Sequence, residues 1–368
     1  MKRTVAFSAF LLCLSLVLFT QPALNAAKTA LSLWWEILLP TLFPFFASAT
    51  LMERTGALHM LANLLHPLSK RLRISRYALP MLLLGGVSGY PSGARLCGML
   101  QRSQCVSGEE AERLGTLCNL CSPMFLMGAV AGGMFSNMRL FLPLAVAHYG
   151  SAVIVAVAVS ILHPIRFAEP PRLMRPPQEP LYRVLPLSIT DGMADMLKVG
   201  GSVVFFLVLA AVLKEMKIIS VLGAPIDAAF AGVKGDSPSQ GILLGILEMT
   251  GGCHLISETG LPILFAVPIC AFLISFGGFS IMVQAMAFVE FRHPMRYISI
   301  KFLQGLLAAV LAYAVLSLSP GSAEVFSPIP SMYAINAITG LSVLFGTALG
   351  TAAAVLLALI FGRRERRS

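Results

Sequence analysis

Charged side chains are scarce in this sequence of 368 residues. Asp, Glu, Lys and Arg make up 12% of it and hydrophobic residues 57%, whereas soluble domains carry roughly 25% charged residues. So few charges cannot cover the water-facing surface of a chain this long. The scarcity excludes an ordinary soluble protein and indicates one whose surface lies mostly in lipid.

Strand-like alternation of apolar and polar residues is also lacking. The apolar residues come in blocks close to the roughly 20 residues that cross a hydrocarbon core as a helix. Because a backbone in lipid must satisfy its own hydrogen bonds, helices are the expected spanning elements. The sequence therefore predicts an all-α, polytopic membrane helical bundle, with the lipid bilayer as its main partner.

Signatures of catalysis and of metal binding are missing as well. The chain has no H-E-x-x-H, no G-x-S-x-G and no P-loop, so we expect no enzyme. Its seven cysteines form neither a disulfide framework nor a paired zinc knuckle. Cys118 and Cys121 make one C-x-x-C inside an apolar stretch, where packing is the commoner role. We expect no cofactor and no metal.

Basic residues outnumber acidic ones, 27 to 17. They have no aromatic interleaving, which argues against a nucleic-acid partner. Instead they form short clusters beside apolar segments, as the positive-inside rule predicts for cytoplasmic loops. This pattern predicts a cell-membrane protein with both termini cytoplasmic, about eight transmembrane helices and two re-entrant hairpins. Whether it forms a homo-oligomer is left open.

The clusters also divide the chain. Residues 1–32 are expected to form a transmembrane helix or signal anchor, with a cleaved signal peptide as the less favoured alternative. A mixed-charge stretch at 214–236 is expected to be an outer loop, and Lys301 is expected at the inner surface before a span over 302–318. The remaining units are a first repeat at 33–163, a proline-rich cytoplasmic linker at 164–190, a second repeat at 191–318, and a last helix at 333–361 within a basic tail region, 319–368.

Four apolar segments carry residues that oppose a continuous helix. Residues 79–101 contain a glycine-rich centre at 85–93, and residues 111–135 contain Asn119, Ser122 and Pro123. In the second half, residues 241–257 are interrupted from Glu248 onward, and residues 261–290 at Gly277 and Gly278. Glycine and proline weaken helices at such positions. We therefore expect one hairpin and one broken helix in each half.

The same order of elements thus occurs twice, each time after a span, at 33–52 and at 199–213. The first half is expected to begin on the outer side of the membrane and the second half on the cytoplasmic side. This arrangement is an inverted-topology repeat, and in many secondary transporters the broken helices of such repeats form the substrate site.

Three stretches resemble a known family: residues 38–45 (LLPTLFPF), 85–94 (GGVSGYPSGA) and 118–125 (CNLCSPMF). They are similar to the YlbJ-type sporulation integral membrane proteins of endospore-forming bacteria. That family carries the nucleoside-recognition, or Gate, domain, which is similar to domains of concentrative nucleoside transporters and of the ferrous-iron transporter. The resemblance implies two Gate-like repeats and a role in sporulation, in making the spore cortex. It supplies no solute.

The polar residues at the breaks are the predicted substrate site. For any single serine, helix packing is the more frequent role, but their coincidence with four breaks favours a site for the set. The members are Ser88, Gly89, Tyr90, Ser92, Asn119 and Ser122 from the first half, and Thr250, Gly277, Ser280 and Gln284 from the second.

Three ionisable residues near the breaks have two interpretations each. Glu248 is predicted to couple transport to a proton or cation, because carboxylates inside a membrane are costly; alternatively it faces water at the hairpin mouth. Arg95 binds an anionic substrate or snorkels to the interface. His254 titrates or is a structural hydrogen-bonding group.

Two functions remain. The first is a transporter or permease that moves a small polar solute in support of cortex formation. The alternative is a non-transporting assembly factor that holds cortex-building proteins at the membrane.

Overall fold

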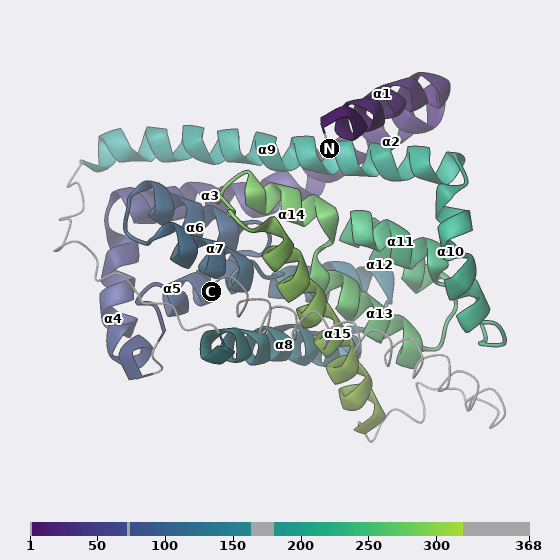
Figure 1. The fold of residues 1–368 in the computed structure, drawn as a ribbon. Helices are drawn as coiled ribbons and strands as arrows, with labels where there is room; N and C mark the ends of the chain where they lie inside the picture. Colours follow the sequence, from purple (N-terminus) through teal and green to yellow (C-terminus); the bar gives the residue numbers. More distant parts are fainter. Residues whose placement is uncertain (1, 72–73, 163–179, 319–368) are drawn as a thin grey trace, which may run out of the picture.

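The computed structural model describes residues 2–71, 74–162 and 180–318, and this part of the chain is helical with no strand (Figure 1). Four of its helices are long and apolar enough to cross a membrane: Met138–Leu162, Leu181–Glu215, Ile263–Met286 and Pro294–Leu318. The all-helical class is therefore confirmed, and these four helices are consistent with a helical membrane protein. The predicted last helix at 333–361, the basic tail and most of the linker lie outside the described residues.

The N-terminal segment differs from the single helix expected at 1–32. It forms two helices, α1 (Lys2–Leu18) and α2 (Thr20–Leu33), and the apolar parts of this pair meet at 95°. Phe19 between them leaves the helical region, with φ −110° and ψ 42°. Pro22 suits the first turn of α2, where amide hydrogens have no partner within the helix.

The span expected at 33–52 is part of a longer helix. After α2 the chain passes through a π-helical turn, η1 (Trp34–Leu38), into α3 (Leu39–Arg54). Pro40 follows this turn and has no amide hydrogen to donate to the preceding turn, which favours such a local widening. The 35-residue helix α9 (Leu181–Glu215) lies alongside α2 and α3 (Figure 1).

Two pairs of short helices form hairpins at the predicted positions, and their re-entrant placement in a membrane stays a prediction. In the first, α5 (Ala78–Ser88) and α6 (Ser92–Arg102) are joined by Gly89, Tyr90 and Pro91. Gly89 has a φ of +81°, a conformation that glycine adopts at little cost. In the second, α11 (Ser239–Leu247) and α12 (Met249–Glu258) meet at Glu248. The arms of each hairpin pack against each other.

Both predicted broken helices are present too. The first consists of α7 (Gly108–Leu117) and a π-helical segment, η2 (Phe125–Met134), separated by an unwound stretch. The second consists of α13 (Ile263–Phe276) and α14 (Gly278–Met286). Gly277 and Gly278 have φ of +83° and +71°, so the helix is interrupted at two residues that adopt this conformation at little cost because they have no Cβ.

Each half ends in a long helix. A 3₁₀ turn, η3 (Met138–Leu140), leads into α8 (Phe141–Leu162) in the first half, and α15 (Pro294–Leu318) closes the second. These two helices pack against each other, and α15 also packs on α13. α8 packs on η2 and α13, and α15 packs on α7 and α13, so each closing helix contacts both broken helices.

Two helices occur where loops were expected. The basic connection after α3 contains α4 (Ala57–Arg71), and the mixed-charge stretch at 214–236 contains α10 (Ile218–Ala229). The end of the expected linker is also helical, because α9 begins at Leu181. Charge was a poor guide here because most of the charged residues flank these helices: α4 carries Lys70 and Arg71 in its last turn, and α10 carries Asp227 alone.

Candidate functional site

Two glycines bring the first hairpin onto the first broken helix. A Cβ atom at Gly85 would lie 2.3 Å from the carbonyl oxygen of Cys118, and one at Gly93 would lie 2.0 Å from the same atom. No real Cβ approaches an oxygen so closely. The two arms of the hairpin therefore rest on the unwound backbone because neither has a side chain at the contact.

The unwound backbone between α7 and η2 is hydrogen-bonded by side chains from the closing helices. The Cys121 N–H donates to His148 Nε2 at 3.0 Å, and the Tyr149 hydroxyl donates to the Cys121 carbonyl at 2.8 Å. The Lys301 ammonium donates to the Asn119 carbonyl at 2.6 Å. Backbone groups left unpaired at membrane depth are costly, so α8 and α15 supply the partners that the broken helix lacks.

The second broken helix is hydrogen-bonded to the first hairpin and to His148 of α8. The Tyr90 hydroxyl, at the tip of the first hairpin, donates to the carbonyl of Ile274 at 3.0 Å, three residues before Gly277. His148 Nδ1 lies 2.8 Å from the Ser275 hydroxyl. Because Nε2 of this ring accepts a hydrogen from Cys121, Nδ1 carries the proton and donates it to Ser275. One imidazole thus joins both breaks.

Lys301 lies at the centre of this arrangement and not at the inner surface where it was expected. Lys301 is completely buried, with 0% of its surface exposed. The ammonium also donates to Gln304 Oε1 at 3.0 Å and lies 5.6 Å from the centroid of the Tyr90 ring. The prediction was wrong because α15 starts at Pro294, which carries Lys301 about two turns into the bundle.

The charge of Lys301 has no acidic partner. Within residues 2–71, 74–162 and 180–318, the ion pairs involve other residues, and both hydrogen-bond acceptors of Lys301 are neutral oxygens. Two buried atoms beside it also lack partners, Asn119 Oδ1 and Gln304 Nε2. The Asn119 amide nitrogen donates to the Tyr297 hydroxyl at 3.1 Å. A buried cation is thus surrounded by polar groups with unused hydrogen-bonding capacity.

Several predicted site residues have local structural roles. The Ser88 hydroxyl donates to Leu84 O at 2.5 Å within its own helix, and Ser122 Oγ accepts from the Phe125 N–H at 3.2 Å. Gln284 donates to the Ser280 hydroxyl at 3.1 Å on α14. Ser92 is buried and its hydroxyl has no partner. Two of the predicted residues have hydrogen bonds that join different elements near Lys301 and His148. Tyr90 donates to Ile274, and Asn119 bonds to Tyr297 and Lys301.

Glu248 caps a helix. Its Oε1 accepts from the Thr250 N–H at 3.0 Å and its Oε2 from the Gly251 N–H at 2.7 Å, at the start of α12. A carboxylate suits this position because amide hydrogens there lack partners and the helix dipole is positive. The residue is only 6% exposed, so the alternative that it faces water is wrong. Its coupling role stays a prediction.

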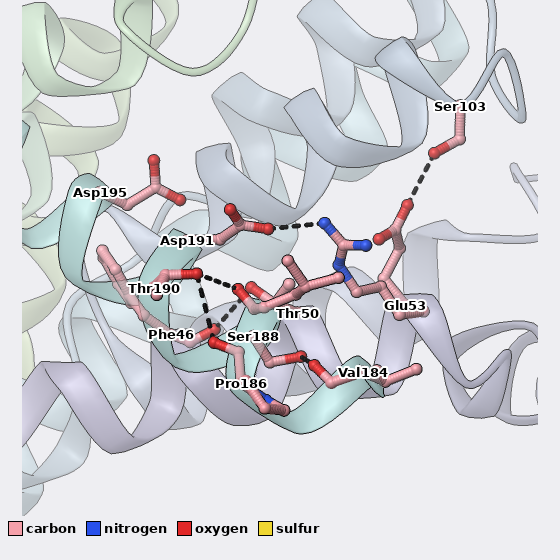
Figure 2. Close-up of polar contacts among 12 residues, drawn as sticks. Phe46, Thr50, Glu53, Ser103, Val184, Pro186, Ser188, Thr190, Asp191 and Asp195 are labelled. Atoms are coloured by element: carbon pink, nitrogen blue, oxygen red, sulfur yellow. Dashed lines mark hydrogen bonds and ion pairs between the residues drawn. The ribbon is translucent and has the colours of Figure 1, made fainter. Parts of the chain in front are cut away.

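Arg95 does not snorkel. It is 2% exposed, and its Nε donates to Asp195 Oδ2 of α9 at 2.5 Å. A neighbouring, more exposed ion pair joins Arg54 of α3 to Asp191 at 2.7 Å (Figure 2). These contacts fasten α3 and α6 to α9. His254 is exposed and pairs with Glu258 at 3.5 Å, away from the breaks.

The residues that sequence reasoning missed lie on the closing helices and at the end of α13. They are polar groups within apolar runs, a signal that marks functional positions in membrane proteins. The missed residues are His148, Tyr149, Ser275, Tyr297, Lys301 and Gln304.

The thiols of Cys118 and Cys121 are free and buried. Within the part of the chain that the structure describes, no group of three or more His, Cys, Asp or Glu residues is placed to hold a metal ion.

The chain is similar to a curated protein of known cellular context. It is 30% identical over 343 residues to the sporulation integral membrane protein YlbJ of Bacillus subtilis (strain 168). The aligned region covers 84% of this chain and 81% of that protein. No family model and no solved structure matches the chain.

Proposed function

Because the chain belongs to the YlbJ-type family of sporulation integral membrane proteins, we propose that it transports a small anionic solute across a membrane of the sporulating cell, in support of cortex formation. The buried Lys301 carries this proposal. It lies where both breaks meet, and its acceptors are neutral oxygens. An uncompensated buried cation is costly, and an anionic solute would provide the missing charge.

The order of elements supports a transporter. From α3 to α8 and from α9 to α15, each half runs through a long helix, a short helix, a hairpin, a broken helix and a closing helix. We place the two halves in opposite orientations, with eight crossings, two Gate-like repeats and cytoplasmic termini. Inverted repeats of this kind carry substrate between their broken helices by alternating access.

The contacts between halves support movement of the two halves as coupled units. The tip of the first hairpin, Tyr90, is bonded to the second broken helix, and His148 is bonded to both breaks. Any opening at the breaks has to exchange these hydrogen bonds for others. A purely structural bundle gains nothing from four interruptions whose backbone groups need partners.

Flux measurements test the proposal. Purified protein in liposomes should take up at least one of labelled succinate, glutamate or inorganic phosphate faster than neutral uridine or cationic lysine. Asn119→Ala should lower that flux about fivefold, because it removes the amide that donates to the Tyr297 hydroxyl beside Lys301, and a hydrogen bond between neutral groups is worth about 0.5–1.5 kcal/mol. Asn63→Ala, at an exposed position of α4, is the matched control and should leave flux unchanged.

The assembly-factor alternative predicts the opposite result. No probe would cross, and in sporulating cells Asn119→Ala would behave as wild type while changes in the loops impaired the cortex. That combination would refute transport.

A further inference from the structure

Buried polar residues recur at helical spacing on two elements that are in contact, α7 with the unwound stretch after it, and α15. On α7 and just beyond it, Glu112, Thr116 and Asn119 follow at i, i+4 and i+7, a spacing that keeps residues on one helical face. On α15, Tyr297, Lys301 and Gln304 have the same spacing. All six are buried, with exposed fractions of 0–4%. We call these six residues the polar file.

Hydrogen bonds connect the polar file at several points. Glu112 Oε2 accepts from the Arg292 N–H at 3.3 Å, directly before α15 begins. The Thr116 hydroxyl donates to the Glu112 carbonyl at 2.7 Å. Further along, Asn119 contacts both Tyr297 and Lys301. The polar file therefore extends from the basic end of α15 to the unwound backbone of the first break.

The polar file also contains unused hydrogen-bonding capacity. Eight buried side-chain nitrogen or oxygen atoms of the described residues lack a partner, and three of them are Glu112 Oε1, Asn119 Oδ1 and Gln304 Nε2. Buried polar atoms in proteins are normally paired with protein groups or ordered water. Their concentration along one file suits a path along which hydrogen bonds form and exchange.

The acceptors around Lys301 resemble the ligands of a coupling cation. They are a carbonyl of unwound backbone and an amide oxygen, and in transporters unwound carbonyls coordinate the coupling ion. Here an ammonium occupies that position, and a buried lysine, unlike arginine, can release its proton. We propose that Lys301 is the proton-carrying group that couples solute transport to proton movement, loaded along the polar file from the Glu112 end. This inference rests on the proposed transport function.

The proton balance is simple. On one side of the membrane the Lys301 amine takes one proton from water and becomes an ammonium, which the anionic solute joins. After the site opens to the other side, solute and proton both leave, and the neutral amine returns. No bond between heavier atoms changes. For a monoanion the cycle moves no net charge.

Other titratable groups face Lys301 from the packed elements. They are Tyr90 from the first hairpin, Cys118 and Cys121 from the unwound stretch, His148 from α8 and Tyr297 on α15 itself. His148 is poorly suited to carry the proton, because its two nitrogens already accept from Cys121 and donate to Ser275. Protonation of Nε2 would break the first of these bonds.

Proteoliposomes that enclose a pH-sensitive dye test the inference with whichever probe of the panel crosses fastest. Wild-type protein should acidify the lumen when that probe enters. Lys301→Arg keeps the charge without a removable proton, so uphill accumulation of the probe should fall about tenfold more than exchange of labelled for unlabelled probe does. Glu112→Gln should slow acidification with exchange unchanged, and it carries the test if Lys301→Arg fails to fold.

Two control variants separate this inference from its rivals. Lys214→Gln, at an exposed position at the end of α9, should behave as wild type. Glu248→Gln should retain acidification, because the amide oxygen still caps α12; loss of acidification in this variant alone would assign coupling to Glu248 and overturn the inference. Probe uptake without acidification would overturn coupling and leave transport intact. Absence of flux with every probe would overturn both proposals.

Discussion

Gly93 is the residue at which the site is least tolerant of added volume. Its α-carbon faces the Cys118 carbonyl, so the methyl group of Gly93→Ala would force the first hairpin away from the unwound backbone. Overpacking of this kind typically costs about 1–3 kcal/mol. We expect a lower midpoint of thermal unfolding in detergent and loss of transport.

Gly201→Ala is the matched control for this substitution. A Cβ at Gly201, inside α9, would have no atom within 4 Å, and alanine is favoured over glycine in a helix by about 1 kcal/mol. The control should unfold at the same temperature or higher. If both variants lost stability equally, the close contact at Gly93 would not be the cause.

At the residue scale, local chemistry decided what the sequence could predict. The breaks at Gly89 and Gly277 were predictable because positive φ at a glycine is a property of the residue itself. Lys301 was not predictable, because the positive-inside rule treats a basic residue near the start of a span as a cytoplasmic marker. Its burial depends on where α15 begins and on what packs around it, which are tertiary facts.

At the scale of elements, two ion pairs of different depth connect α9 to its neighbours. Arg95 and Asp195 have side-chain exposures of 2% and 12%, whereas Arg54 and Asp191 have 32% and 46%. Removing one partner of a buried pair costs about 3–5 kcal/mol, and an exposed pair contributes about 1 kcal/mol or less. Arg95→Met should therefore lower the unfolding midpoint far more than Arg54→Met.

A second substitution shows whether the pair itself is responsible. Lys198 contacts the other carboxylate oxygen of Asp195 at 2.8 Å, which offsets part of the loss. In Arg95→Met with Asp195→Asn, no uncompensated carboxylate remains, so the double variant should be more stable than the sum of the two single changes implies. Additive effects of the two changes would contradict this account.

The helical breaks were predictable at this scale, but the short helices α4 and α10 were not. Glycine and proline interrupt helices through the local backbone, and their positions can be read directly. The charged residues that suggested loops around α4 and α10 lie mostly outside these two helices. The contact of α9 with α3 depends on residues more than 100 positions apart, such as Arg54 and Asp191, and no local sequence pattern predicts it.

For the whole molecule, the opposite orientation that we propose for the two halves predicts opposite accessibility of the two hairpins. Single cysteines introduced at Val87 and at Thr250, in a chain whose seven native cysteines are replaced by serine or alanine, should react with an impermeant thiol reagent from different sides of the membrane. Sealed vesicles of both orientations provide the measurement. Labelling of both positions from one side would rule out the inverted arrangement.

The imidazole of His148 has a consequence for how the molecule opens. Its two ring nitrogens hold Cys121 and Ser275 at the same time, so a rotation of the ring that frees one partner also abandons the other. Both interruptions would then switch in step around a shared pivot. In the proposed transporter, two interruptions coupled in this way would have no state in which one is open and the other closed, so small ions would not leak through such a state.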